Sequence, residues 1–143
     1  TQYAEEVSNA LKSFMLFKSE HPEFILKRSE VAMESDKYKV NGTLDCIAEK
    51  EGKKTILDWK SSDAKDYNIP AVFPNFVWQT SAYVHLWNDT QSDSIDTSYV
   101  LVLAKDKIAY NLQKIDEKEI KESFKQVFLP ALKIYNYTKK KGK

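Results

Sequence analysis

The chain has 143 residues, of which 42% are hydrophobic and 30% are charged, and it contains three glycines and four prolines. This composition excludes disordered and fibrous proteins and predicts one compact domain over residues 1–143. The 22 basic and 21 acidic residues nearly cancel, so the net charge gives no reason to expect a polyanionic partner.

The sequence shows neither a transmembrane segment nor the basic-then-apolar order of a signal peptide. The single cysteine, Cys46, excludes an internal disulfide and a four-cysteine zinc or iron–sulfur site within this chain. We therefore expect an intracellular, cytoplasmic protein without membrane contact, or one acting in a host cell if a phage encodes it. The start at Thr1 leaves open that the domain belongs to a longer chain.

Apolar residues at helical spacing predict a first helix that ends before His21 and covers the sheet. The residues of this stripe are Tyr3, Val7, Ala10, Leu11, Phe14 and Met15. Alternating and β-branched residues then predict three strands separated by turn residues. These strands cover residues 24–34, 37–49 and 53–60.

A loop from Ser62 to Pro74 follows the third strand, and its length indicates a functional segment. A second helix is predicted over residues 75–87. The stripe that predicts it consists of Phe76, Gln79, Tyr83, Leu86 and Trp87. Residues 97–104 and 108–113 are predicted to form a β-hairpin.

The last predicted element is a helix that starts at Asp116, where Glu119 completes a capping-box pattern, and Pro130 is expected to kink it. Its apolar stripe consists of Ile120, Phe124, Val127, Phe128, Ala131, Leu132 and Tyr135. The basic end, 139–143, is expected to be a solvated tail, with phosphate contacts as the alternative. The order of elements predicts an α/β fold with a mixed central β-sheet flanked by helices.

Acidic residues on two adjacent predicted strands are the most informative feature of the sequence. Because side chains in a strand alternate between faces, Asp58 and Lys60 project to one side of the sheet, which we expect to be polar. A hairpin turn at Glu51-Gly52 places Asp45 directly opposite Asp58. Two opposed carboxylates repel each other, and a divalent cation such as Mg²⁺ or Mn²⁺ would compensate them.

Lys60 beside such a cation is suited to orient or deprotonate a water and to stabilise charge on a phosphate, which is the chemistry of phosphodiester hydrolysis. The tripeptide acid-x-Lys alone is uninformative, because it occurs five times. Its copies start at Glu51, Asp58, Asp63, Asp116 and Glu119. Only the copy at Asp58 ends an apolar strand opposite another acid, and an ordinary solvated sheet face remains the alternative.

These residues resemble the motifs of the PD-(D/E)XK nuclease superfamily, in particular its RecB-type exonuclease branch. Gly42–Asp45 resembles the first acidic motif, and Ile56–Ser62 resembles the second. The pair Gln79 and Tyr83 resembles the Gln-x-x-x-Tyr motif that marks the RecB branch. Leu44 stands where the superfamily name has proline, a departure that the RecB branch tolerates.

The resemblance implies a restriction-endonuclease-like core and a deoxyribonuclease that depends on Mg²⁺ or Mn²⁺. It implies that Asp45 and Asp58 bind the metal, that the Trp59 carbonyl adds a ligand, and that Lys60 is the catalytic lysine. Glu30, in the strand before Asp45, is a further candidate that would reach the metal through water, and an exposed strand glutamate is the alternative.

Helix residues supply the remaining candidates for the site. Gln79 and Tyr83 share a helix face, which is consistent with contacts to the site or to DNA, with simple packing as the alternative. His85 has no second ligand at helical spacing and is interpreted as an ordinary helix histidine, and His21 is given no metal-binding role.

Aromatic residues cluster in and just after the long loop, close to Lys65. These residues are Tyr67, Phe73, Phe76 and Trp78. Their rings would suit stacking on single-stranded bases, and packing of the loop onto the sheet is the alternative.

The sequence therefore predicts a metal-dependent DNA nuclease, with a RecB-type exonuclease acting on DNA ends or single strands as the specific hypothesis. Such an enzyme would serve DNA repair or recombination, with a helicase or recombinase as the expected kind of partner. A catalytically inactive, nuclease-derived module that binds DNA or a protein partner is one alternative, although Asp45, Asp58 and Lys60 are all intact. An unrelated metal-binding or interaction domain is the other.

Overall fold

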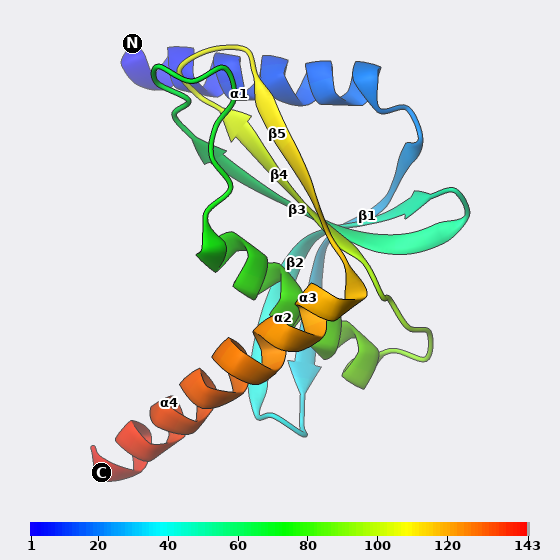
Figure 1. Cartoon of the computed structure of the whole chain (residues 1–143), viewed down its shortest axis with the longest axis vertical. Coiled ribbons are helices and arrows are strands. Elements are labelled where there is room, and N and C mark those ends of the chain that lie inside the picture. Colours follow the sequence, from blue (N-terminus) through cyan, green and yellow to red (C-terminus); the bar gives the residue numbers. More distant parts are fainter. Residues whose placement is uncertain (143) are drawn as a thin grey trace.

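The computed structural model describes residues 1–142 and contains a mixed five-stranded β-sheet with helices on both faces (Figure 1). The predicted order of elements and the α/β class are confirmed. The elements are α1 (Gln2–Glu20), β1 (Phe24–Ser35), β2 (Val40–Lys50), β3 (Lys53–Ser62), α2 (Pro74–Thr90), β4 (Ser98–Ala104), β5 (Tyr110–Ile115), α3 (Glu117–Ser123), the π-helical turn η1 (Phe124–Phe128) and α4 (Leu129–Lys141). No helix within residues 1–142 has the length and hydrophobicity needed to cross a bilayer.

The strands lie in the sheet in the order of the sequence, from β1 to β5. All neighbouring pairs are antiparallel except β3 and β4, which are parallel because α2 connects them as a crossover. The predicted register of the β2–β3 hairpin is confirmed, since Lys50 pairs with Lys53 and Cys46 pairs with Leu57. Gly52 forms the turn with a φ of 78°, a conformation that favours glycine.

The sheet forks where β2 and β3 separate. Pairing between them ends at Cys46 and Leu57, after which β3 stays paired with β4 as far as Ser62. The other arm, β1 with β2, continues as a two-stranded ribbon beside α2 to the turn at 36–39 (Figure 1). From Val40 to Asp45, β2 is paired with β1 along one edge only. Within the described part of the chain, no strand pairs with its other edge.

Two apolar clusters pack against opposite faces of the sheet, one under α2 and α3 and one under α1. Leu44 and Ile47 both belong to the α2 cluster, although residues three apart in a regular strand face opposite sides. The alternation of β2 is therefore broken between them, at Asp45 and Cys46. On β1, opposite this break, Glu30 adopts a φ of 51°. Both strands are therefore irregular at the fork.

The first helix covers the sheet as predicted, but with a different face. Tyr3, Leu11 and Met15 of the predicted stripe are 77%, 59% and 67% exposed. The buried residues are Ser13 and Phe17, and the Ser13 hydroxyl donates a hydrogen bond to the carbonyl of Ala104 at 3.2 Å. A small polar residue thus anchors the helix to the β4–β5 turn, which hydrophobic periodicity does not predict.

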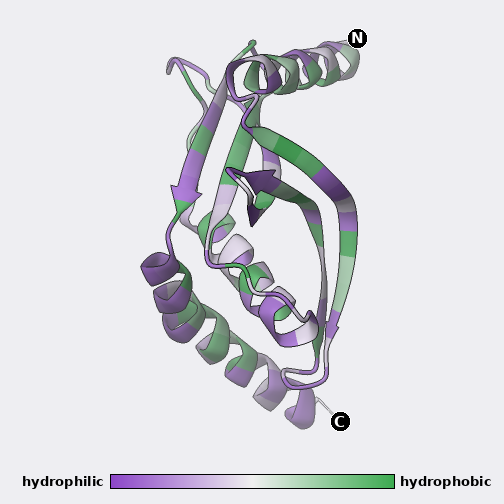
Figure 2. Ribbon diagram, turned by 90° about the vertical axis from the view of Figure 1, so that its right-hand side faces the viewer, coloured by the Kyte–Doolittle hydropathy of each residue, from purple (hydrophilic) through white to green (hydrophobic). Residues whose placement is uncertain are grey.

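The last helix departs furthest from the predicted packing. Asp116 caps α3 by accepting from the Glu119 amide at 2.9 Å, and the predicted irregularity at Pro130 takes the form of the π-helical turn η1. Ile120 and Phe124 are buried as expected, but α4 buries none of its residues. It extends away from the sheet in Figure 1, and Figure 2 shows hydrophobic and hydrophilic residues along it. Ala131 and Tyr135 of the predicted apolar stripe are exposed, and Leu132 is half-buried.

Candidate active site

The two acidic residues predicted to bind metal flank the fork of the sheet. The last paired residues of the two strands are Cys46 and Leu57. Asp45 and Asp58 are their neighbours on the side where the strands separate. The Trp59 amide donates a hydrogen bond to Oδ2 of Asp45 at 3.0 Å, so a side chain replaces the missing strand partner. The predicted juxtaposition of Asp45 and Asp58 therefore exists, held by a side-chain hydrogen bond across the fork.

Asp58 is a buried acid, only 1% exposed. The pKa of Asp58 is raised to about 7, first by burial and then by the Asp45 carboxyl within hydrogen-bonding reach, whereas the charge of Lys60 opposes the rise. Oδ2 of Asp58 lies 3.3 Å from Nζ of Lys60 but receives no hydrogen bond of suitable geometry. A buried carboxylate oxygen is thus left incompletely satisfied, and such an oxygen destabilises the protein unless a proton or a cation binds it.

The donor set at the fork fits a divalent cation. Asp45 and Asp58 offer hard carboxylate oxygens, one of them without a hydrogen bond. Within residues 1–142, no group of three or more His, Cys, Asp or Glu side chains converges. Mg²⁺ is commonly held by one or two carboxylates together with waters and substrate phosphates, so two carboxylates suffice for that ion.

Lys60 lies on the same side of β3 as Asp58, as the alternation of side chains predicted. The expectation that this side is polar is wrong, because Ile56 of the same face is fully buried under α2. Nζ of Lys60 donates a hydrogen bond to Oε1 of Gln79, and Nε2 of Gln79 donates to the Tyr83 hydroxyl at 2.9 Å. A chain of polar contacts therefore runs from Asp58 through Lys60 to two residues of α2.

The buried face of α2 is rotated from the predicted stripe. Its buried residues are Val77, Thr80, Ser81, Ala82, Val84, Leu86 and Trp87. Gln79 is exposed and Tyr83 is half-buried, so both lie at the margin of this face, next to the fork. Burial, followed by the charge of Asp58, raises the pKa of Tyr83. Tyr83 packs against the core, and its hydroxyl also accepts a hydrogen bond from Gln79 within the polar chain.

Gly42 has a structural role that the sequence did not reveal. A Cβ atom at this position would lie 3.0 Å from Cε1 of Tyr83 and 3.4 Å from Cδ1 of Leu86. The absence of a side chain lets the tyrosine ring approach β2 closely. Gly42 belongs to the first acidic motif, and this is the feature of the sequence that could have indicated its structural role.

Glu30 and Trp59 are placed beside the fork but have no demonstrated link to a metal. Glu30 lies across from Asp45, between the paired residues Ser29 and Val31, and its side chain is exposed. The ring of Trp59 packs edge-on against Phe14 at 5.9 Å on the α1 side, and its amide serves Asp45. A water-mediated role for Glu30 and a ligand role for the Trp59 carbonyl stay predictions.

The aromatic residues of the loop differ in their distance from the site. Phe76 lies closest, with its ring centroid 5.8 Å from Nζ of Lys60, and Phe73 packs edge-on against Phe76 at 5.4 Å. Phe73 and Trp78 are about half exposed, and Tyr67 is 77% exposed. Phe76 packs against the core cluster under α2, whereas the other three rings are accessible to a ligand.

The remaining candidates lie away from the fork. His85 stacks on Phe124 at 3.7 Å, and burial lowers its pKa, consistent with the interpretation as an ordinary helix histidine. His21 ends α1 and contacts Glu23 at 2.8 Å. Cys46 is buried, and burial raises the pKa of its thiol to about 11, so it is an inert core residue.

Comparisons with known proteins bear on this site. A family model described as the PD-(D/E)XK nuclease superfamily matches residues 2–138. Among 17 matching chains of solved structures is "Crystal structure of SSO0001", with 14% identity over 82% of this chain and a TM-score of 0.46. The present chain spans 56% of the length of that solved chain. A comparison with curated proteins gave no match. The family model extends over every element from α1 into α4.

Proposed function

This chain belongs to the PD-(D/E)XK nuclease superfamily, and from that premise we propose that it is a Mg²⁺-dependent nuclease that hydrolyses phosphodiester bonds in DNA. The observation that carries the proposal is the convergence of Asp45, Asp58 and Lys60 at the fork. Oδ2 of Asp58 is buried and receives no hydrogen bond of suitable geometry, although it lies near Lys60. A cation between them and a phosphate beside Lys60 would satisfy all three groups.

Asp45 and Asp58 would hold the cation, Mg²⁺ or Mn²⁺, with Glu30 through water and the Trp59 carbonyl as further contacts. When bound, such an ion supplies Lewis-acid polarisation of the phosphate and lowers the pKa of a water. The Trp59 amide fixes the Asp45 carboxylate, so that residue is positioned before any ligand arrives. Burial of Asp58 strengthens its interaction with a cation, because the surroundings screen charge weakly.

Lys60 is the proposed catalytic cation of the chain. Its ammonium group is held between Asp58 and Gln79, where it can orient the attacking water and stabilise the negative charge that develops on the phosphate. Gln79 and Tyr83 are positioning residues, because they act on the phosphate only through Lys60 in this arrangement. Their hydrogen bonds restrict the ammonium group to one location.

The specific hypothesis is an exonuclease of the RecB type that acts on DNA ends or single strands, with a helicase or recombinase as partner. The contact between Lys60 and the Gln79–Tyr83 pair supports it, since this pair forms the Gln-x-x-x-Tyr pattern of that branch. The accessible rings of Phe73 and Trp78 support a single-stranded substrate, because stacking on bases requires unpaired strands.

A nuclease assay with matched variants tests the proposal. Single-stranded and double-stranded DNA, linear or circular, would be incubated with Mg²⁺ or EDTA. We expect cleavage only with the metal, and a loss of about 10³-fold in Asp58→Asn, since metal stabilisation contributes several kcal/mol. Asp63→Asn is the control, because Asp63 is exposed and begins another acid-x-Lys tripeptide.

The outcomes separate the parts of the proposal. Cleavage that survives in Asp58→Asn would remove the site assignment. Cutting of circular DNA would replace the exonuclease hypothesis with an endonuclease. Absence of cleavage on every substrate, with retained DNA binding, would favour the inactive binding module instead.

A further inference from the structure

We propose that α4 and the free edge of β2 form a binding track for single-stranded DNA, with Tyr135 stacking on a base and Lys139, one turn further along the same face of α4, contacting a phosphate. This inference rests on the proposed nuclease function, because the bound strand is the substrate of that site. It extends the function by assigning where the strand lies beyond the fork.

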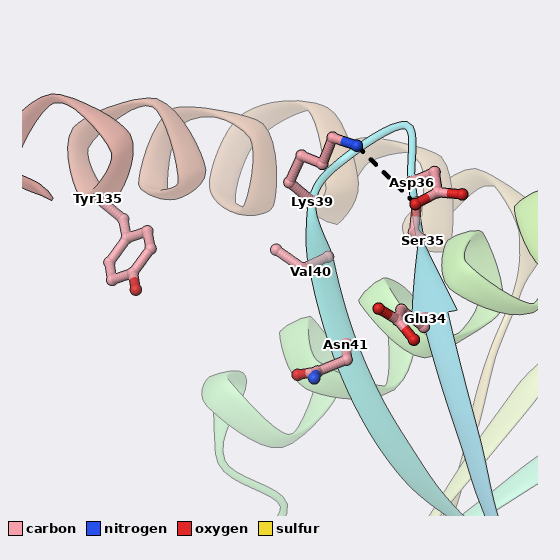
Figure 3. A pocket seen from close by; sticks show the side chains of 7 residues that line it. All are labelled: Glu34, Ser35, Asp36, Lys39, Val40, Asn41 and Tyr135. Atoms are coloured by element: carbon pink, nitrogen blue, oxygen red, sulfur yellow. Dashed lines mark ion pairs between the residues drawn. The ribbon is translucent and has the colours of Figure 1, made fainter. Parts of the chain in front are cut away.

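The first observation is a cleft between the β1–β2 ribbon and α4. Its volume is about 380 Å³, which is sufficient for one nucleotide-sized group, since small-molecule sites start near ~300 Å³. Figure 3 shows the ring of Tyr135 directed from α4 into the space beside β2, on the side to which Asn41 also points. Tyr135 is 59% exposed, so its ring has free area for a ligand.

The second observation is the position of this cleft relative to the fork. Asn41 and Asp45 are four residues apart on β2, a separation of ~13 Å along a strand. No strand covers this edge of β2 within residues 1–142. An extended strand of a few nucleotides held beside Asp45 would therefore follow the open edge of β2 toward Tyr135.

The third observation is the charge of the helix that forms the other wall. From Phe124 to Lys141 lysine is the only charged residue type, although the whole chain is nearly neutral. Because α4 buries no residue, its lysines and tyrosines are not explained by packing within the described chain. Interleaved lysine and tyrosine side chains are suited to a polyanion whose bases are unpaired.

The acidic residues of the cleft decide how the strand is oriented. Glu34 and Asp36 lie on the β1–β2 side, where Asp36 faces Lys39 at 3.8 Å. These carboxylates would repel phosphates. The phosphates are therefore assigned to the α4 side, near Lys139, and the base is assigned to the cleft.

Fluorescence anisotropy of labelled oligonucleotides in EDTA tests the track without cleavage. We expect Tyr135→Ala to weaken single-strand binding about 5-fold or more, the lower end of the effect of losing one stacked base. In Lys139→Ala, the lost phosphate contact should lower the salt dependence by about 0.7 in the slope of log K against log salt. The controls are Tyr3→Ala and Lys12→Ala on α1, which are also exposed. These substitutions remove no buried group, so folding is expected to be unchanged.

Normal binding by the α4 variants, or an equal loss in the α1 controls, would overturn the inference. An equal effect of Tyr135→Ala on duplex binding would overturn the assignment to single strands. Hydrolysis of bis(p-nitrophenyl) phosphate, which is too small to reach α4, separates this inference from the nuclease proposal. If the wild type hydrolyses this compound and Tyr135→Ala binds single strands normally, the binding track is refuted and the nuclease proposal stands. If the α4 variants specifically lose strand binding but the wild type hydrolyses nothing, the nuclease proposal is refuted and the binding track stands.

Discussion

The two halves of β3 have different surroundings and different roles. From Lys53 to Leu57 the strand pairs residue by residue with β2, and its buried side chains are Thr55, Ile56 and Leu57. From Asp58 onward β2 is absent on one side, and an acid and a lysine replace the apolar residues. The first half contributes to the stability of the sheet, and the second half carries the proposed catalytic groups.

This difference shows how a fork creates a site within a sheet. Where two strands separate, backbone groups lose their partners, and side chains such as Asp45 can take their place. The opening also gives a cation and a phosphate access to an otherwise buried position. Substitutions in the two halves should therefore differ in kind, those before the fork changing stability and those after it changing activity.

Among substitutions that leave both carboxylates of the site in place, the largest effect is expected for Lys60→Met. Removing the ammonium group should lower turnover by about 10²- to 10³-fold, comparable to the loss of one group that stabilises transition-state charge. Binding of Mn²⁺, measured by calorimetry, should remain because Asp45 and Asp58 are intact. Lys65→Met is the control, since Lys65 ends the tripeptide that begins at Asp63. Unchanged turnover in Lys60→Met, or loss of metal binding, would contradict the assigned role.

Asp58 should make the stability of the metal-free protein depend on pH. Its pKa is raised to about 7 in the folded protein from an ordinary value of 3.8, so the folded state retains a proton that the unfolded state has lost. Stability should therefore fall as the pH rises from about 4 to about 7 and then level off. Asp58→Asn should remove this fall and stabilise the metal-free protein at pH 8 by about 1 to 3 kcal/mol.

Urea denaturation in EDTA at pH 5 and pH 8 measures this effect. Groups other than Asp58 contribute equally to both proteins, so the difference between wild type and variant isolates the one carboxyl group. Mg²⁺ should stabilise the wild type more at pH 8 than at pH 5, because the metal competes with the proton. The same pH dependence in Asp58→Asn would show that Asp58 ionises normally.

Gly42→Ala tests whether the close approach of Tyr83 to β2 matters for the site. The added methyl group, 3.0 Å from the tyrosine ring, should displace the ring and cost about 1 to 3 kcal/mol of stability, as overpacking does. Turnover should fall about 10-fold, since a small displacement of a positioning residue reduces catalysis, while the Michaelis constant changes little. If combining Tyr83→Leu with Gly42→Ala restores activity, the tyrosine ring is not needed for the site. That result would contradict the positioning role of Tyr83.

The smallest effect is expected for Gly52→Ala, the matched substitution before the fork. Gly52 has a φ of 78° and no atom within 4 Å of a built Cβ, so the cost is backbone strain alone. We expect a loss of about 1 kcal/mol in unfolding free energy and no change in turnover. A fall in turnover like that of Gly42→Ala would show that the turn at Gly52 and the site at the fork are not independent.

Local pattern was sufficient for much of the fold. The order of elements, the register of the β2–β3 hairpin and the cap at Asp116 all follow from periodicity and turn chemistry over a few residues. The helix faces were less predictable. Hydrophobicity predicted apolar stripes on the first and last helices, but Ser13 anchors α1 through a distant turn and α4 buries none of its residues.

By itself the sequence determined which residues could form the site, because hairpin register and the alternation of side chains bring Asp45, Asp58 and Lys60 together. Only the tertiary structure decided that Asp58 is buried, that β2 leaves β3 beside it, and that Gln79 reaches Lys60 from α2. The physical reason is that register depends on neighbouring residues, whereas burial and strand divergence depend on contacts between segments far apart in the chain.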